Sequence, residues 1–138
     1  SIVKPKNISA AISNIKGNCW NGSFWNFEKQ WKLEYIKSKE TQDFGDLMNP
    51  ILKVPENNKG LFWRTWIKGD YIYPLGMKGK KKISDILTDS KVPSCLRHQQ
   101  VLLSDSISLG EVYWIPGLQL SRNVKIDNEE KYIRFNDQ

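Results

Sequence analysis

The feature that most constrains the fold is the strict alternation within FEKQWKLEYIK, residues 27–37. Apolar residues occupy one face of an extended chain and polar residues the other, which places Phe27, Trp31, Leu33 and Tyr35 opposite Glu28, Gln30, Lys32 and Glu34. Because successive side chains of a strand point to opposite faces, this pattern predicts a half-buried strand of an antiparallel sheet. Asn21-Gly22, just before it, predicts a hairpin with a two-residue turn.

More short strands are expected, because runs of β-branched and aromatic residues are separated by Gly, Pro and Asn. The expected strands cover residues 51–54, 61–67, 71–76, 101–104, 111–117, 118–126 and 131–135. Together with residues 27–37 they make about seven or eight strands. The chain is therefore expected to be dominated by antiparallel sheet.

Two short helices are expected in the second half of the chain. Residues 83–90 repeat apolar side chains at helical spacing, and Ser84 or Asp85 would cap the N-terminus of that helix. Pro93 suits the first turn of a second helix, over residues 93–99. The fold class is therefore α+β: mostly antiparallel β-sheet with two or three short helices.

The first twenty residues have a different character. Isoleucines at helical spacing predict a helix over residues 7–16 that ends at Gly17, with Ile8, Ile12 and Ile15 on one face. We expect residues 1–20 to be a linker or a short helix from a preceding domain, and residues 21–138 to form a single α+β domain. The chain starts with Ser1 rather than Met, which suggests a piece of a longer protein.

The sequence predicts a cytoplasmic protein without a membrane partner. No run of about 18 apolar residues is present, and the N-terminus lacks the apolar core of a signal peptide. Cys19 and Cys95 are the only cysteines, and two unlinked thiols suit a reducing compartment.

The distribution of charge predicts a surface that faces a polyanion. Residues 61–97 carry a net charge of +5, in a chain whose formal net charge is +6. Residues 1–39 also carry +5, whereas residues 40–60 and 98–138 carry −2 each. A basic middle between acidic flanks favours nucleic acid as the partner.

The densest positive charge is the run KGKKK, from Lys78 to Lys82. Gly76 and Gly79 let the backbone approach a ligand, and the expected helix from residue 83 adds exposed N–H groups. These features favour phosphate oxygens, which lysine contacts as a point charge without reading bases. The alternative is a solvated loop that only increases solubility.

The tryptophans have a simpler explanation than base stacking. Trp31 and Trp63 lie in expected strands on alternating positions, where we expect them to pack in the core rather than to stack on bases. For Trp66 and Trp114 the sequence does not decide between packing in the core and exposure at the surface.

No group of residues with catalytic or metal-binding chemistry stands out. Cys95 and His98 lack an orienting acid, and a single histidine without a nearby Cys/His group argues against zinc binding. Asp85 and Asp89 share one expected helix without a partner histidine. Asp70, after a glycine, is most simply a turn residue.

An ordered series of motifs runs through residues 50–126. It comprises an arginine strand, Gly-Asp, a Pro-x-Gly turn, a lysine-rich loop, two aspartates, Lys-Val-Pro, an arginine and a tryptophan strand ending at glycine. These motifs are formed by Arg64, Gly69, Asp70, Pro74, Gly76, Lys78 to Lys82, Asp85, Asp89, Lys91, Val92, Pro93, Arg97, Trp114 and Gly117, followed by Arg122 and Lys125. In these residues the chain resembles the C-terminal domain of tRNA(Ile)-lysidine synthetase.

The resemblance implies a domain similar to one in the phenylalanyl-tRNA synthetase β chain, which helps to bind tRNA, including its acceptor stem. The whole enzyme is implied to use ATP to attach lysine to the wobble cytidine of isoleucine tRNA. ATP and magnesium are implied to bind an N-terminal catalytic domain whose SGGxDS-type loop is absent here. We therefore expect no catalytic residue, cofactor site or metal site in this chain. The expected partners are tRNA(Ile) and the N-terminal catalytic domain, and a homodimer is left open.

The expected tRNA contacts, to the phosphates, fall into two ranks. The first rank is Lys78, Lys80, Lys81 and Lys82, and the second is Arg97, Lys91 and Arg64. Two residues depart from the family pattern: Gln119 stands where an arginine is frequent, and Gln100 where a proline is frequent. The alternative function is an intramolecular or subunit-docking module whose basic face makes no direct RNA contact.

Overall fold

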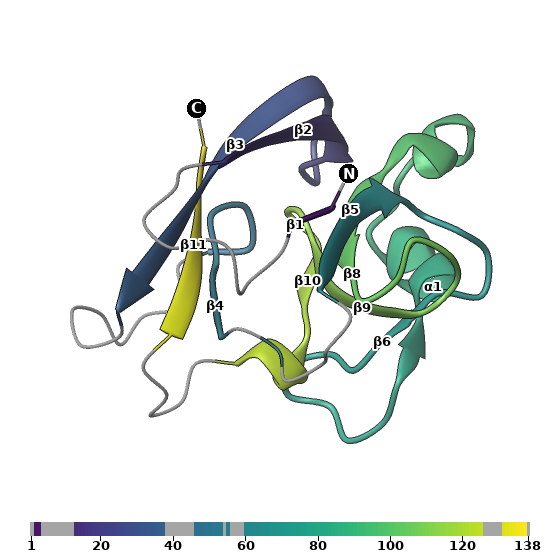
Figure 1. The fold of residues 1–138 in the computed structure, drawn as a ribbon. Coiled ribbons are helices and arrows are strands. Elements are labelled where there is room, and N and C mark those ends of the chain that lie inside the picture. Colours follow the sequence, from purple (N-terminus) through teal and green to yellow (C-terminus); the bar gives the residue numbers. More distant parts are fainter. Residues whose placement is uncertain are drawn as a thin grey trace.

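The computed structural model describes residues 2–3, 13–37, 46–53, 55, 60–125 and 131–137. Two β-sheets lie side by side, and a short helix lies against the larger sheet on the side away from the smaller one (Figure 1). The sheets are mostly antiparallel, and the described helices are short. The expected α+β fold class is therefore confirmed.

The smaller sheet contains the strand predicted from the alternating pattern. Its order is β2-β3-β11-β4, with bounds Ser13–Trp20, Trp25–Lys37, Lys131–Asp137 and Ile51–Lys53. All of its pairs are antiparallel. Trp31 and Leu33 are fully buried, as the alternation predicts.

The larger sheet has the order β1-β5-β8-β9-β6-β7, and β10 also pairs with β9. The bounds are Ile2–Val3 for β1, Leu61–Thr65 for β5, Tyr71–Ile72 for β6, Lys81–Lys82 for β7, Val101–Ser104 for β8, Glu111–Ile115 for β9 and Gln119–Leu120 for β10. β6 and β9 are parallel, whereas the other described pairs of this sheet are antiparallel. β7 ends the sheet, and its hairpin with β6 therefore projects from the edge.

The main core lies between the two sheets and is built around three tryptophans. The ring centroids of Trp31, Trp63 and Trp114 are 5.4–5.7 Å apart, and all three side chains are buried. Their indole N–H groups donate to the backbone carbonyls of Met48, Lys16 and Leu47 respectively. Burial with a satisfied indole is the packing expected of core tryptophans. The core role predicted for Trp31 and Trp63 is confirmed, and Trp114 joins them.

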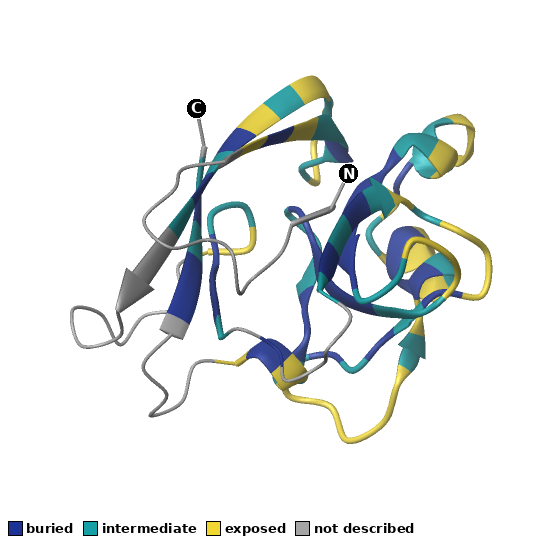
Figure 2. Ribbon diagram, in the orientation of Figure 1, coloured by how far each residue is buried: buried dark blue, intermediate teal, exposed yellow. Residues whose placement is uncertain are grey.

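A second core lies between the larger sheet and helix α1 (Ile83–Asp89). Ile83, Ile86 and Leu87 are buried on one face of the helix, at the predicted spacing. They belong to a cluster that also contains Ile72, Leu102 and Val112, and Trp66 packs against it while partly buried. Dark blue marks these buried positions in Figure 2, whereas the loop before β7 is exposed.

The structure corrects the expected helix over residues 7–16. Residues 13–16 belong to β2, which pairs with β3, and residues 4–12 lie outside the described part of the chain. Ile15 and Cys19 both enter the main core. Apolar residues at helical spacing were the only signal for a helix there, and tertiary packing overrides such a weak preference.

The Asn21-Gly22 hairpin is confirmed, but its turn is longer than predicted. Trp20 pairs with Trp25, which leaves four residues between the strands. The side chain of Asn21 accepts hydrogen bonds from the N–H groups of Ser23 and Phe24, and Gly22 has a φ of +97°. The asparagine side chain therefore stabilises a wider turn in place of the two-residue one.

The prediction that Phe27 lies on the buried face of the strand is wrong, since its side chain is 72% exposed. The register of β2 and β3 shifts by one residue between Gly17 and Cys19, and Glu28 has a φ of +45°. A bulge of this kind reverses the inward and outward positions on one side of it. Phe27 lies beyond the bulge and faces outward.

The two helices expected after the lysine run are present, but their ends and caps differ from the prediction. α1 ends at Asp89 rather than residue 90, and Lys82 occupies its N-cap position without a side-chain hydrogen bond, so neither Ser84 nor Asp85 caps it. The expected second helix is the 3-10 helix Ser94–Gln99, preceded by Pro93. β5 also ends at Thr65, two residues before the predicted end.

Candidate nucleic-acid interface

The lysine cluster lies on the hairpin that joins β6 and β7. Tyr71 pairs with Lys82 and Ile72 with Lys81 across this hairpin. Residues 76–80 between the strands are exposed, and Gly76 takes a φ of +80° in the turn. We call residues 76–82 the lysine loop. It projects from the edge of the larger sheet as the exposed segment in Figure 2.

The four lysines of the lysine loop are not equivalent. Lys81 forms an ion pair with Asp89 at the far end of α1. Lys78, Lys80 and Lys82 are exposed, and no acidic side chain among the described residues pairs with them. Three uncompensated ammonium groups therefore remain at the edge of the sheet, together with one that is partly neutralised.

The helix N-terminus contributes less than the sequence suggested. The N–H of Ile83, the first residue of α1, donates to the carbonyl of Asp70. Because this donor is used within the fold, the lysine side chains are the main source of positive potential here.

Lys91 lies at the other end of α1 in a conformation that lysine rarely takes. Its φ is +59°, its N–H donates to the carbonyl of Thr88, and the next N–H, of Val92, donates to Leu87. These two bonds form a Schellman motif, in which glycine is the usual residue at the position of Lys91. The Lys91 side chain is exposed.

Arg97 is half-buried and partly used by the fold. Its Nε donates to the carbonyl of Val92 and its Nη1 to the hydroxyl of Thr88. The guanidinium therefore joins the 3-10 helix to the end of α1. Its remaining donors keep it a candidate for a phosphate contact.

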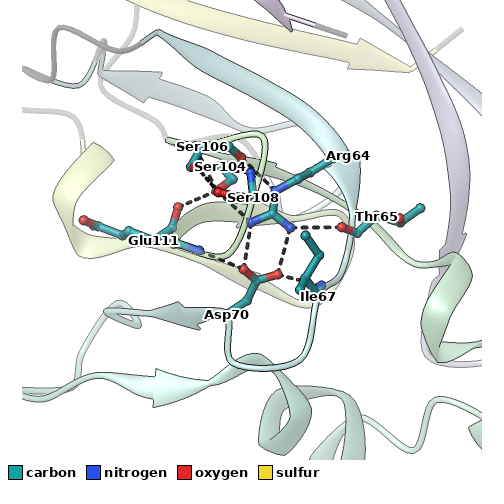
Figure 3. A network of polar contacts seen from close by, with 9 residues as sticks. Arg64, Thr65, Ile67, Asp70, Ser104, Ser106, Ser108 and Glu111 are labelled. Carbon is teal, nitrogen blue, oxygen red and sulfur yellow. Dashed lines mark hydrogen bonds and ion pairs between the residues drawn. The ribbon is translucent and has the colours of Figure 1, made fainter.

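Arg64 is held inside the fold, and its place among the expected tRNA-binding residues stays a prediction that this geometry does not favour. Its guanidinium forms two hydrogen bonds to the carboxylate of Asp70, at 2.8 and 2.7 Å (Figure 3). The other three N–H groups donate to Ser106 O, Thr65 O and Ser104 Oγ. Since arginine has five donors, none remains for a phosphate.

Asp70, interpreted from the sequence as a simple turn residue, is the centre of this network. Its side chain is fully buried and also accepts hydrogen bonds from the N–H groups of Ile67 and Gly110. Its backbone carbonyl accepts from Ile83. Asp70 therefore ties together β5, the turn before β6, the turn before β9 and the start of α1, and it anchors both ends of the hairpin that carries the lysine loop.

One basic residue near the lysine loop was absent from the expected contacts. The guanidinium of Arg122 lies over the ring of Tyr73 and donates to the carbonyl of Met77, inside the lysine loop. Arg122 begins the 3-10 helix Arg122–Val124 and reaches this place because Ser121 bridges to Pro74. Its presence in the motif series was the signal that pointed to it.

The described residues contain no metal-binding cluster and no disulfide. They contain no group of three or more His, Cys, Asp or Glu side chains that could hold a metal ion. Cys19 is buried, Cys95 is exposed, and no disulfide joins them. The helices of the described part are all too short or too polar to cross a membrane.

Two packed sheets, with a basic hairpin at one edge of the larger sheet, define a small α+β domain. The family model described as the TilS substrate C-terminal domain matches residues 61–136, more than half of the chain. The chain therefore belongs to this family.

Relatives and a solved structure agree with this assignment. The tRNA(Ile)-lysidine synthase of Bacteroides thetaiotaomicron is 30% identical over 118 residues, covering 77% of this chain and 26% of that protein. The tRNA(Ile)-lysidine synthase of Parabacteroides distasonis is 33% identical over 105 residues, covering 74% and 23%. The chain thus spans about a quarter of the length of these relatives.

A solved structure described as a crystal structure of the TILS C-terminal domain has the same fold. Its TM-score is 0.64, with 20% identity over 93% of this chain and 97% of that chain. The resemblance read from the motif series is confirmed. The similarity to the phenylalanyl-tRNA synthetase β chain stays a prediction.

Proposed function

We propose that this chain is the tRNA-binding C-terminal domain of an ATP-dependent ligase that attaches lysine to the wobble cytidine of isoleucine tRNA. In this proposal the lysine loop contacts the phosphate backbone, including that of the acceptor stem. The whole-length relatives carry the name of this enzyme. Catalysis, ATP and Mg²⁺ would belong to a separate N-terminal catalytic domain, and the enzyme would work in the cytoplasm.

The observation that carries the proposal is the exposure of Lys78, Lys80 and Lys82 on a hairpin held from below by a buried ion pair. The grooves and phosphates of an A-form helix are recognised mostly by shape and backbone charge. Lysines on a projecting hairpin supply that charge without reading a base sequence. Rigid anchoring limits the ordering that binding would require.

Lys91 supports the proposal from the other end of α1. A residue other than glycine with a positive φ is uncommon, and its strain invites a functional explanation. Glycine would relieve the strain but would remove the ammonium group. Lys91 and Arg97 are therefore the second-rank contacts, and the geometry does not favour Arg64 among them.

The proposal is tested by titrating the domain with minor isoleucine tRNA at two salt concentrations, with elongator methionine tRNA as competitor. The double variant Lys78→Glu/Lys82→Glu should lose affinity and show a shallower salt dependence. The matched control is Lys16→Glu/Lys32→Glu, which removes the same charge from strands β2 and β3 of the other sheet. Equal losses in the two variants would reduce the effect to net charge and reject the lysine loop as the binding site.

A second candidate function is docking onto another protein part, and the β2–β3 hairpin favours it. Phe24 and Phe27 are 58% and 72% exposed, and Trp25 contacts Phe27 edge to face. Exposed aromatic clusters mark interaction surfaces. Association with the N-terminal catalytic domain, or of two copies of the chain, would then be insensitive to salt and independent of RNA. Phe24→Ser/Phe27→Ser should abolish it while leaving RNA binding intact.

A further inference from the structure

Two tyrosines stand side by side next to the lysine loop. Tyr71 and Tyr73 flank Ile72, which is fully buried, so both lie on the outward side of this segment. Both side chains are half-buried. Their ring centroids are 5.9 Å apart and the ring planes are perpendicular. The pair is a partly exposed aromatic surface of fixed geometry.

A basic side chain lies over each of the two tyrosine rings. The ammonium of Lys80 is 4.8 Å from the Tyr71 ring centroid, and the guanidinium carbon of Arg122 is 5.0 Å from that of Tyr73. Arg122 is held in place, because its backbone N–H donates to the Tyr73 carbonyl and its side chain to the Met77 carbonyl. The side chain of Lys80 is exposed. Its ammonium lies over the Tyr71 ring at the end of a flexible aliphatic chain.

We propose that Tyr71, Tyr73, Lys80 and Arg122 form a subsite for one unpaired nucleotide beside a double-stranded stretch of RNA. The base stacks on the Tyr71 ring, while the Lys80 ammonium leaves that ring for the nucleotide's phosphate. Arg122 stays over Tyr73 and contacts the same phosphate with guanidinium donors that have no partner among the described residues. This inference rests on the proposed function, since the lysine loop must first bring RNA to the hairpin.

The chemistry of the site favours an unpaired nucleotide over a continuous duplex. Bases inside a duplex are already stacked, so phosphates alone would meet the lysine loop and the tyrosines would add nothing. An unpaired base has a free face, and stacking on an aromatic ring next to cations is the recurring way proteins bind it. Among the described residues, cations near a ring are also found at Trp31, but that side chain is buried in the core.

The charges around Tyr71 fix the direction of the nucleotide. In the sheet, Tyr71 lies between Lys82 on β7 and Glu111 on β9. Burial raises the pKa of the Tyr71 phenol, and the nearby carboxylates of Glu111 and Asp105 raise it further. A phosphate is repelled from the carboxylate side, and it is therefore expected on the side of β7 and the lysine loop.

The test compares two RNA hairpins of identical stem, both closed by a non-nucleotide linker so that the loop offers no unpaired base. One is blunt, and the other is extended by a single unpaired nucleotide at its open end. Their affinities for the chain are measured by fluorescence anisotropy at one fixed salt concentration. We expect the extended RNA to bind at least about fivefold more tightly, the lower bound for one stacked base. Tyr71→Leu should remove this preference while keeping blunt-hairpin affinity, and Tyr71→Phe should retain it.

The outcomes separate the subsite from the proposed function. Equal affinity of the wild-type chain for blunt and extended RNA overturns the subsite and leaves phosphate binding intact. A preference that survives in Tyr71→Leu, shown to be folded by circular dichroism, also overturns it. Absence of binding to both hairpins overturns the proposed function, and the subsite with it. The wild-type comparison needs no variant, so it decides even if Tyr71→Leu fails to fold.

Discussion

Arg64 and the lysine loop lie on the same sheet and contribute to the same basic segment of the chain, but they use their charge in opposite ways. All five donors of Arg64 are satisfied inside the protein, and its partner Asp70 is fully buried. Lys78, Lys80 and Lys82 are exposed without an acidic partner among the described residues. The role of a basic residue therefore follows from whether its donors are satisfied inside the protein, and a count of charges does not distinguish the two roles.

The largest effect is expected where the internal pair is broken. Asp70→Asn leaves the guanidinium of Arg64 without its counter-charge in a buried site, and we expect a loss of about 3–5 kcal/mol in the free energy of unfolding. Urea unfolding followed by tryptophan fluorescence measures it. Asp85→Asn, at an exposed position of α1, is the control, with an expected loss below about 1 kcal/mol. Similar losses in both variants would mean that Asp70 is an ordinary surface carboxylate.

The opposite pattern is expected for the lysine loop. Lys78→Gln/Lys82→Gln should lower the affinity for tRNA about tenfold or more at moderate salt, because two phosphate contacts are lost. The slope of log affinity against log salt should fall by about 1.5–2. The free energy of unfolding should change by less than about 0.5 kcal/mol. A large loss of stability would show that these lysines, like Arg64, serve the fold.

Lys91 should combine both roles in one residue. Lys91→Gly removes the strain of a positive φ at the end of α1, and we expect it to stabilise the domain by about 0.5–1 kcal/mol. The same change should weaken tRNA binding by several fold, since one cation is lost. Thermal unfolding and the tRNA titration on one preparation measure both. Stabilisation with unchanged affinity would remove Lys91 from the interface.

The smallest effect is expected at Asp89, which neutralises Lys81. Asp89→Asn should release Lys81 and strengthen tRNA binding by about two- to threefold at low salt, because exposed ion pairs are worth less than about 1 kcal/mol. Raising the salt should abolish this gain. Weaker binding in this variant would indicate that the ion pair holds Lys81 in its productive position.

The sequence predicted those features that depend on periodicity. The alternation in β3 predicted that Trp31 and Leu33 are buried. The helical spacing predicted the same for Ile83, Ile86 and Leu87. Both predictions are confirmed. The burial predicted for Phe27 was wrong, because a bulge in the pairing of β2 with β3 changes the register locally. Periodicity cannot reveal a change that is caused by the partner strand.

The candidate site was harder to predict, because its properties depend on contacts distant in the sequence. The lysine loop was visible as a local run, but Arg64 and Arg122 differ only in what surrounds them. Arg64 meets Ser104 and Ser106 about 40 residues away, and Arg122 meets Met77, 45 residues away. Neither set of partners can be read from spacing in the chain. Asp70 does close a turn with Ile67, but its bond from Gly110, 40 residues away, could not be predicted for the same reason.

The position of β7 at the end of the larger sheet gives its lysines a second consequence. A terminal strand exposes backbone groups to which another polypeptide can add by hydrogen bonding, and such edges promote aggregation. β7 consists of only Lys81 and Lys82, and a short strand made of charged residues is a poor template for strand addition. Neutralising these lysines, for example by acetylation, would therefore lower the colloidal stability of the protein. It would also remove the charge repulsion that keeps a second polypeptide from pairing with the edge strand β7.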